Sequence, residues 1–300
     1  MPALVEEKVE STMQLFHSQR GRGRLARVMA GFVLTALVVA LGVDIAMAAA
    51  PEPWQLGFQT PASETKERIH SLHNILLVII TLITLFVLGL LIYTMIRFRA
   101  SRSPNPSRVA HNTILEVAWT AIPIIILIII AVPSFKLLYY ADRTAKPDMT
   151  IKVVGHQWYW SYEYPDQGNF TFDSYIIQEA DLKPGQKRLL EVDNRLVLPV
   201  DTAVRILVAG TDVIHSWMVP ALGVQIYAMP GRINETWVKV DRPGVYYGQC
   251  NQICGINHGY MPIAVEALSK PDFERWLAEA KTKFAAAGGD APVALAETRR

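Results

Sequence analysis

Three apolar stretches dominate the first half of the chain, at residues 28–43, 75–96 and 117–138. The second stretch has no charged side chain, and the third carries only Lys136 near its end. As helices, these two stretches are each long enough to cross a hydrocarbon core about 30 Å thick. The pattern therefore predicts a transmembrane helical hairpin within residues 71–141.

The first apolar stretch is shorter and has the features of an export signal. Arginines precede it, and the small residues Ala46 and Ala48 stand three positions and one position before a bond that a signal peptidase would cut. We therefore expect residues 1–48 to be a signal peptide that is cleaved near Ala48. An uncleaved anchor is the alternative, but Asp44 leaves the apolar run short for a membrane span.

The loop between the two predicted spans indicates their orientation. Its basic residues are Arg97, Arg99, Arg102 and Arg108, and no acid precedes them in the loop. Cytoplasmic or matrix-facing loops carry such an excess of basic residues. Both ends of the hairpin are then expected outside, and residues 49–70 form an exterior N-terminal segment.

From residue 142 onward, the pattern changes to short β-prone runs separated by turns that contain glycine and proline. These runs lie at residues 150–154, 157–164, 188–193, 203–209, 236–240 and 262–267. Many short strands of this kind predict a β-sandwich or barrel over residues 142–270. We expect an amphipathic helix and a loose tail at residues 271–300.

Composition narrows the class of protein. The chain has 300 residues, of which 51% are hydrophobic and 19% charged, and this fits a protein that is partly in lipid and partly in water. The formal net charge of +2 argues against a strongly basic nucleic-acid-binding protein. Cys250 and Cys254 are the only cysteines, which excludes a disulfide-dense scaffold and a four-cysteine metal cluster.

The segment at residues 250–261 concentrates side chains that bind soft metals. It contains Cys250, Cys254, His258 and Met261. Thiolate, thioether and imidazole ligands suit copper. Two thiolates can bridge two metal ions, and such a dinuclear site needs a second imidazole, for which His215 is the best candidate.

Two other interpretations of this segment stay open at this point. In an exported domain, two cysteines four positions apart can form a disulfide. Two cysteines and two histidines can also hold structural zinc. Neither interpretation uses Met261, and a disulfide leaves both histidines unexplained, but spacing alone does not decide between them and copper.

Four segments, in this order along the chain, resemble subunit II of the haem-copper cytochrome c oxidases. They are residues 115–123 (LEVAWTAIP), 155–164 (GHQWYWSYEY), 215–217 (HSW) and 250–261 (CNQICGINHGYM). The resemblance covers about residues 63–284, and it implies a two-helix hairpin followed by an all-β, cupredoxin-like Greek-key sandwich. It also implies an electron-entry subunit of a proton-pumping oxidase, which accepts electrons from cytochrome c and passes them to haem in subunit I. Oxygen would be reduced there, because this chain alone has no oxygen-reducing site.

The resemblance further implies a dinuclear copper A centre. In chain order, its ligands correspond to His215, Cys250, the backbone carbonyl of Gln252, Cys254, His258 and Met261. The thiolates would bridge, each imidazole would bind one copper, and the thioether and the carbonyl would be weak ligands. The family commonly has Glu where this chain has Gln252, and that Glu also reaches a magnesium ion. A neutral amide is a poorer ligand for a hard cation, so we do not expect Gln252 to ligate magnesium.

Residues that would serve the electron donor follow from the same resemblance. Alternation places Trp158, Trp160, Tyr162 and Tyr164 on one face of a strand, which on its own indicates a buried aromatic face. The resemblance makes Trp158 an exposed entry point for electrons from cytochrome c. Nearby acids form either a solvated loop or a docking surface for this basic partner. They are Glu163, Asp166, Asp173, Glu179 and Asp181, to which family position adds Asp193 and Asp212.

Glu116 has two interpretations. Residues 113–116 match a capping box for the helix that follows, and the family has a matching Glu near the mouth of a proton pathway into subunit I. The two roles are compatible.

Two other functions and the location complete the expectations. A quinol-oxidase subunit II typically lacks the copper ligands, and a copper-storage or delivery protein would not need two spans and Glu116. We expect a bacterial inner membrane, with the C-terminal domain in the periplasm and contacts to lipid, subunit I and other oxidase subunits. A mitochondrial inner membrane is the alternative.

Overall fold

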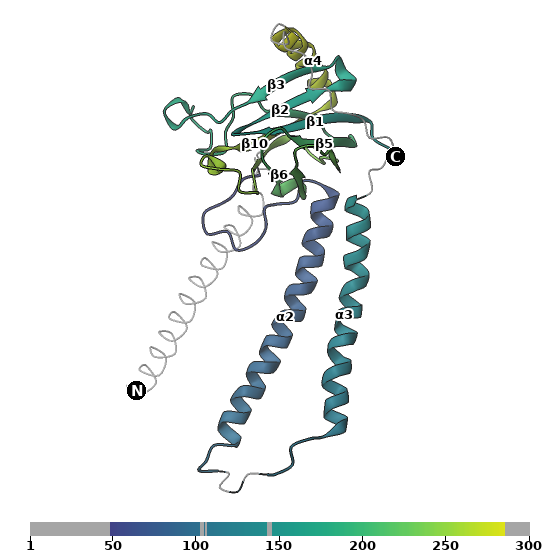
Figure 1. Ribbon diagram of the computed structural model, residues 1–300, viewed down its shortest axis with the longest axis vertical. Coiled ribbons are helices and arrows are strands. Elements are labelled where there is room, and N and C mark those ends of the chain that lie inside the picture. Colours follow the sequence, from purple (N-terminus) through teal and green to yellow (C-terminus); the bar gives the residue numbers. More distant parts are fainter. Residues whose placement is uncertain (1–48, 103–104, 106, 143–145, 286–300) are drawn as a thin grey trace, which may run out of the picture. The chain divides into compact units, whose positions relative to one another are not determined.

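The computed structural model describes residues 49–102, 105, 107–142 and 146–285. The expected signal peptide and most of the expected C-terminal tail lie outside these residues. The described chain consists of two long helices, a β-rich domain and a final helix (Figure 1). This order confirms the prediction of a helical hairpin followed by an all-β domain.

The hairpin consists of α2 (Glu64–Arg97) and α3 (Thr113–Asp142). Both helices are long and apolar enough to cross a membrane, and their apolar side chains are not buried within the chain. Helix α2 begins at Glu64, inside the segment at residues 49–70 that we expected to lie outside the membrane. Its first turn packs against the β domain, where Thr65 and Lys66 are buried.

Hydrogen bonds tie the start of α2 to the β domain. Ser63 caps the helix by accepting from the Lys66 N–H at 3.1 Å, and its hydroxyl donates to the Leu222 carbonyl at 2.7 Å. The Ala62 N–H donates to the Ala221 carbonyl at 2.9 Å. The start of α2 is therefore buried and hydrogen-bonded to the β domain, and is not joined to it by a free linker.

At the other end of the hairpin, Asn112 caps α3. Its side-chain oxygen accepts from the Leu115 N–H, and the Glu116 carboxylate accepts from the Asn112 N–H, both at 3.2 Å. The capping box predicted at residues 113–116 is therefore wrong in its N-cap, since Asn112 rather than Thr113 caps the helix, while Glu116 does reach back to the cap backbone. Asn is the better cap because its amide oxygen reaches the first turn while its backbone stays outside the helix.

Three sheets make up the β domain as described. The largest has the strand order β3-β2-β1-β5-β8. Its strands are β1 (Met149–His156), β2 (Tyr159–Tyr164), β3 (Phe170–Ser174), β5 (Val204–Gly210) and β8 (Asn234–Val238). A second sheet has the order β4-β10-β9, with β4 (Leu196–Pro199), β9 (Gly244–Gln249) and β10 (Pro262–Leu268). The third pairs β6 (His215–Val219) with β7 (Val224–Ala228).

The sheets face one another across a core of alternating strand residues. On β2, Trp160, Tyr162 and Tyr164 all point inward and are completely buried, which confirms the aromatic face. Trp158 lies before the strand and is only half-buried. Helix α4 (Lys270–Ala285) closes one side of the core, where Trp276 packs on Tyr164 with ring centroids 5.4 Å apart.

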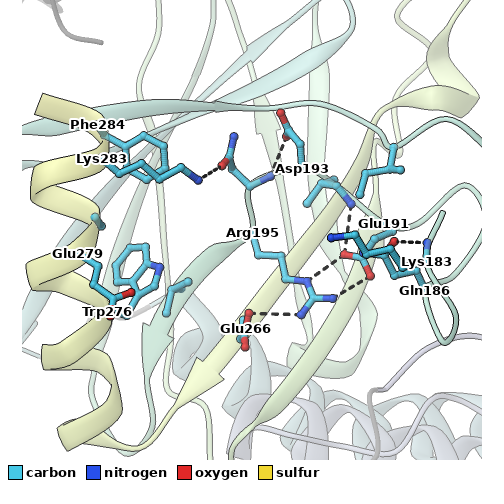
Figure 2. Close-up of a pocket in the computed structure, with 15 residues that line it drawn as sticks. Lys183, Gln186, Glu191, Asp193, Arg195, Glu266, Trp276, Glu279, Lys283 and Phe284 are labelled. Atoms are coloured by element: carbon cyan, nitrogen blue, oxygen red, sulfur yellow. Dashed lines mark hydrogen bonds and ion pairs between the residues drawn. The ribbon is translucent and has the colours of Figure 1, made fainter. Parts of the chain in front are cut away.

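The predicted strand at residues 188–193 is wrong. The chain forms turns there, with Leu189 at φ 63°, and only Val192 makes an isolated bridge. The physical reason is a buried carboxylate: Glu191 is 1% exposed and takes two hydrogen bonds from Arg195, at 2.8 and 2.9 Å. Tyr247 donates a third at 2.8 Å. Turns let this charge face its partners beside a cavity of about 460 Å³ next to α4 (Figure 2).

Gly248 of β9 allows two sheets to approach each other closely. A Cβ at this position would lie 1.9 Å from the backbone carbonyl oxygen of Met218 on β6. Backbone cannot move aside as a flexible side chain can, so any side chain here would separate β9 from β6.

We expect Gly248→Ala to lower the free energy of unfolding by about 3 kcal/mol or more, because the added methyl group overpacks two backbones. Gly57→Ala is the control, since nothing lies within 4 Å of a Cβ there. Urea unfolding of the purified chain in detergent, followed by tryptophan fluorescence, measures both. Equal midpoints for the two variants would contradict this account of the contact.

Candidate metal centre

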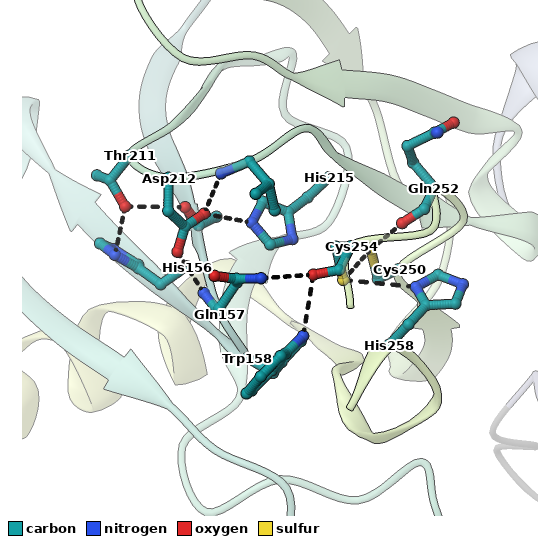
Figure 3. A network of polar contacts seen from close by, with 12 residues as sticks. His156, Gln157, Trp158, Thr211, Asp212, His215, Cys250, Gln252, Cys254 and His258 are labelled. Atoms are coloured by element: carbon teal, nitrogen blue, oxygen red, sulfur yellow. Dashed lines mark hydrogen bonds and ion pairs between the residues drawn. The ribbon is translucent and has the colours of Figure 1, made fainter. Parts of the chain in front are cut away.

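The candidate centre is built from three segments that are distant in sequence (Figure 3). The loop between β9 and β10 closes on itself, because the Cys250 N–H donates to the Met261 carbonyl at 3.0 Å. The Asn251 N–H donates to the Ser216 carbonyl at 3.1 Å, and this bond joins the loop to the start of β6. Since His215 is the first residue of β6, the bond places its ring beside the cysteines.

The donor atoms lie at metal-binding distances from one another. The Sγ atoms of Cys250 and Cys254 are 3.8 Å apart, and His258 Nδ1 lies 3.5 Å from the Cys254 sulfur. Ligand atoms of His215 and both cysteines all lie within 4.8 Å of one another. A disulfide requires sulfurs about 2.05 Å apart, so both thiols are free and the disulfide interpretation is wrong for this structure.

His215 is held so that one ring nitrogen is left for a metal. Its Nε2 pairs with Asp212 Oδ1 at 2.8 Å, while the buried Nδ1 has no hydrogen-bond partner by distance among the described residues. Figure 3 shows this second nitrogen on the cysteine side of the ring. A carboxylate behind a histidine fixes the ring and raises its basicity as a ligand. The orphaned nitrogen beside two thiols therefore fits a soft metal ion.

The remaining candidate ligands lie in the same loop. The backbone oxygen of Gln252 is 3.3 Å from Cys250 Sγ, so the carbonyl points into the site. Met261 is 1% exposed and belongs to the core that contains both cysteines. All the side chains expected as copper ligands are thus gathered around one loop.

The electrostatics of the cysteine pair are asymmetric. Burial alone would raise the pKa of Cys250, but the neighbouring His215 ring and the Ser216 backbone lower it. For Cys254, burial and the neighbouring Cys250 charge both raise the pKa. The metal-free pair therefore holds its first negative charge readily and its second only at a cost. A cation between the sulfurs removes that cost.

Trp158 contacts the backbone of the loop. Its indole N–H donates to the Cys254 carbonyl at 3.2 Å, and the Gln157 side-chain amide donates to the same oxygen at 2.8 Å. Gly255 makes this approach possible, because a Cβ there would lie 2.9 Å from the Trp158 ring and its φ is +124°. Trp158 thus links the surface to a cysteine through a single hydrogen bond.

A hollow of about 470 Å³ opens beside this tryptophan. Its lining is aromatic and amide in character and carries no charged side chain. Tyr159, Tyr175 and Tyr260 contribute rings, and Gln178 and Asn257 contribute amides.

The fold divides the acidic residues into two groups. Glu163 pairs with Lys152 at 2.9 Å, and Asp166 accepts from the Thr150 N–H at 2.7 Å. Both lie toward the end of β2 that is away from Trp158, and that strand is about 17 Å long.

The other acids lie toward the hollow. Asp173 accepts from the Ser161 hydroxyl at 2.6 Å, and Asp193 accepts from the Tyr175 N–H at 2.7 Å. Glu179 pairs with Arg188 at 2.7 Å and, with Asp181, forms the short helix η2 (Glu179–Asp181) directly after Gln178.

Asp212 has a role that sequence reasoning missed. The resemblance placed it among the docking acids, and in the structure its carboxylate also pairs with Nε2 of His215 at 2.8 Å. An acid three residues before a candidate ligand is the spacing that could have indicated this second role. His156, Gln157 and Thr211 also contact this region, and nothing in their spacing pointed to it.

Comparison with known proteins gives a consistent family. The model described as "Cytochrome C oxidase subunit II, periplasmic domain" matches residues 149–268, and the transmembrane-domain model of the same subunit matches residues 51–137. The probable cytochrome c oxidase subunit 2 of Rickettsia bellii is 53% identical over 262 residues, which is 87% of this chain and 97% of that protein.

A second relative and a solved structure are also similar to this chain in sequence. Cytochrome c oxidase subunit 2 of Oenothera berteroana is 50% identical over 239 residues, covering 78% of this chain and 93% of its own length. The crystal structure of the periplasmic domain of subunit II of cytochrome oxidase from Bradyrhizobium japonicum is 50% identical. It covers 47% of this chain and 99% of its own, with a TM-score of 0.45.

Proposed function

The chain belongs to the cytochrome c oxidase subunit II family, and from this premise we propose that its metal centre is a dinuclear copper A site that cytochrome c reduces. The protein is the electron-entry subunit of a haem-copper oxidase, is anchored in a membrane and works with subunit I. The family membership argues against a copper-storage protein, and the presence of all five side-chain ligands argues against a quinol-oxidase subunit.

The observation that carries the proposal is the cluster of His215, Cys250 and Cys254, with Nδ1 of His215 left unpaired. We assign His258, Met261 and the Gln252 carbonyl as the further ligands. Cys250 and Cys254 would hold a copper pair between them, and such a pair would supply one-electron chemistry with little movement of its ligands. Zinc offers no such chemistry and has no use for Met261.

The chain's own residues keep the site dry and rigid. His215 is fully buried, and the cysteines are 4% exposed. The backbone hydrogen bonds of Cys250 and Asn251 hold the loop in place. Asp212 holds the His215 ring and is itself held by the Gln157 N–H. Ligands held in this way cannot relax when the charge changes, and this keeps the cost of electron transfer low.

Gln252 serves the site through its main chain alone in this proposal. A carbonyl ligand does not depend on the side chain, so replacement of the family's usual Glu leaves copper binding intact. We propose that the amide does not ligate magnesium, because hard cations prefer carboxylates. Metal analysis of the purified complex that found magnesium on this amide would refute that assignment.

The test of the centre is its spectrum. Copper added to the metal-free full-length chain is expected to give a mixed-valence dinuclear EPR signal, and Met261→Leu is expected to change that signal. Met229→Leu, outside the loop, is the control and is expected to leave the spectrum as in the wild type. A mononuclear signal, or preferential uptake of one zinc ion, would overturn the proposal.

Trp158 is proposed as the electron entry point, because it joins the surface hollow to the Cys254 backbone. Trp158→Phe keeps an aromatic ring but removes the hydrogen bond to the Cys254 carbonyl. We expect the rate of reduction by cytochrome c, measured by stopped flow, to fall at least about tenfold, with the copper spectrum unchanged. Trp276→Phe, on α4, is the control. Equal rates for both variants would exclude Trp158 as the entry point.

All seven acids are proposed for donor docking, and the test compares one acid near the hollow with one far from it. Asp181 follows the residues that line the hollow, and Asp166 lies just beyond the far end of β2. Asp181→Asn and Asp166→Asn each remove one negative charge. We expect the first variant to flatten the dependence of the reaction rate on salt more than the second, because steering is strongest near the contact. If both variants keep the wild-type salt slope, these acids do not steer the donor.

Glu116 is proposed as the entry to a proton pathway in addition to capping α3. Glu116→Gln keeps an oxygen that can accept from the Asn112 N–H, so the cap is retained. We expect oxidase turnover to fall at least about tenfold while the copper absorption stays intact. Unchanged turnover would leave the cap as the only role of this side chain.

We also propose a bacterial inner membrane with the β domain in the periplasm. The arginines between α2 and α3 support this orientation through the positive-inside rule. The expected signal peptide before Ala49 supports it independently, and the mitochondrial inner membrane is the alternative.

A further inference from the structure

The ends of β1 and β5 carry a set of contacts that electron transfer does not itself require. The two strands run parallel and end together, with Gly155 opposite Gly210. We propose that His156 and Thr211 are positioning residues, which clamp these two strand ends and thereby set the orientation of the metal ligand His215. The inference rests on the proposed copper function, and it names two residues whose roles are new.

Four hydrogen bonds make up this clamp (Figure 3). The Thr211 N–H donates to the Gly155 carbonyl at 3.1 Å. The Thr211 hydroxyl pairs with His156 Nδ1 at 2.9 Å and with the same Gly155 carbonyl at 3.3 Å. The Gln157 N–H donates to Asp212 Oδ2 at 2.7 Å. Two residues that follow β5 are thereby bound to three at the end of β1.

The clamp acts on His215 through Asp212. One oxygen of this carboxylate is held by Gln157, and the other meets His215 Nε2 at 2.8 Å and the Val213 N–H at 2.6 Å. Gly155 sets the limit on the opposite side, since a Cβ there would lie 2.9 Å from the His215 ring. The ring is therefore confined between β1 and the carboxylate, and a shift of Thr211 would pass directly to it.

His156 is itself fixed before it contacts Thr211. Its Nε2 pairs with the Ser161 hydroxyl at 3.1 Å, and the same hydroxyl donates to Asp173 at 2.6 Å. The ring stacks on Tyr159 with centroids 4.4 Å apart and an interplanar angle of 6°. Both ring nitrogens and one ring face are in use, so the imidazole is a rigid support for the hydroxyl of Thr211.

The deciding variants are Thr211→Val, which keeps the shape and removes the hydroxyl, and Thr211→Ser, which keeps the hydroxyl. His156→Phe keeps the stacked ring and removes both hydrogen bonds. If His156 and Thr211 act as one unit, the double variant His156→Phe/Thr211→Val changes amide exchange and copper affinity no more than either single variant does. If the effects of the two single variants add up in the double variant, the proposed clamp is wrong.

The first measurement uses the full-length chain without metal. Hydrogen exchange of the Gln157, Thr211 and Val213 amides reports directly on the clamp and its carboxylate. We expect Thr211→Val to speed this exchange at least about fivefold, because the hydroxyl contacts with His156 and with the Gly155 carbonyl are both lost. Thr211→Ser is expected to leave it near the wild-type rate. Unchanged exchange in Thr211→Val would overturn the proposal whatever the site binds.

The second measurement uses copper and separates positioning from stability. We expect the copper dissociation constant of Thr211→Val to rise about tenfold, with a changed EPR signal, while Thr211→Ser stays within about twofold of the wild type. If exchange speeds up and copper binding does not change, the contacts are structural only and the positioning role is excluded. If wild-type protein binds no copper pair, the proposed function fails, and the exchange result still decides the clamp.

Discussion

The close approach of β9 to β6 is the constraint on which the rest of the structure depends. Gly248 lets the two backbones touch, and the bond from the Asn251 N–H to the Ser216 carbonyl continues that contact into the loop. His215 begins β6 and Cys250 directly follows β9, so the contact between these strands brings the two residues together. A centre whose ligands are distant in sequence is thus fixed by backbone geometry rather than by the side chains themselves.

Hydrogen bonds to the backbone also join the membrane hairpin to the β domain. Ala62 and Ser63 bond to the segment at residues 221–222, which leads from β6 into β7. The anchor therefore attaches next to the strand that carries His215. This arrangement gives the proposed ligand His215 and the membrane helices a common support, which suits a subunit that delivers electrons.

The surface at the proposed entry point, Trp158, is neutral, and acidic side chains lie around it. The hollow beside Trp158 has aromatic and amide walls, while Asp173 and Asp193 lie nearby and bind local hydroxyl or backbone groups. Long-range attraction can then guide a basic partner, and contact at the tryptophan itself does not require a charge to lose its water.

The sequence by itself determined the two membrane helices, the β domain and the set of ligand types in the Cys250–Met261 loop, because hydrophobic period and ligand type are local properties. It also indicated the buried aromatic face of β2, since alternation is local as well. Only the tertiary structure decided that Asp212 orients His215, that the acids fall into two groups, and that residues 188–193 turn around a buried Glu191. These features depend on which strands meet and in what register, and that is set by packing between segments that no local pattern connects.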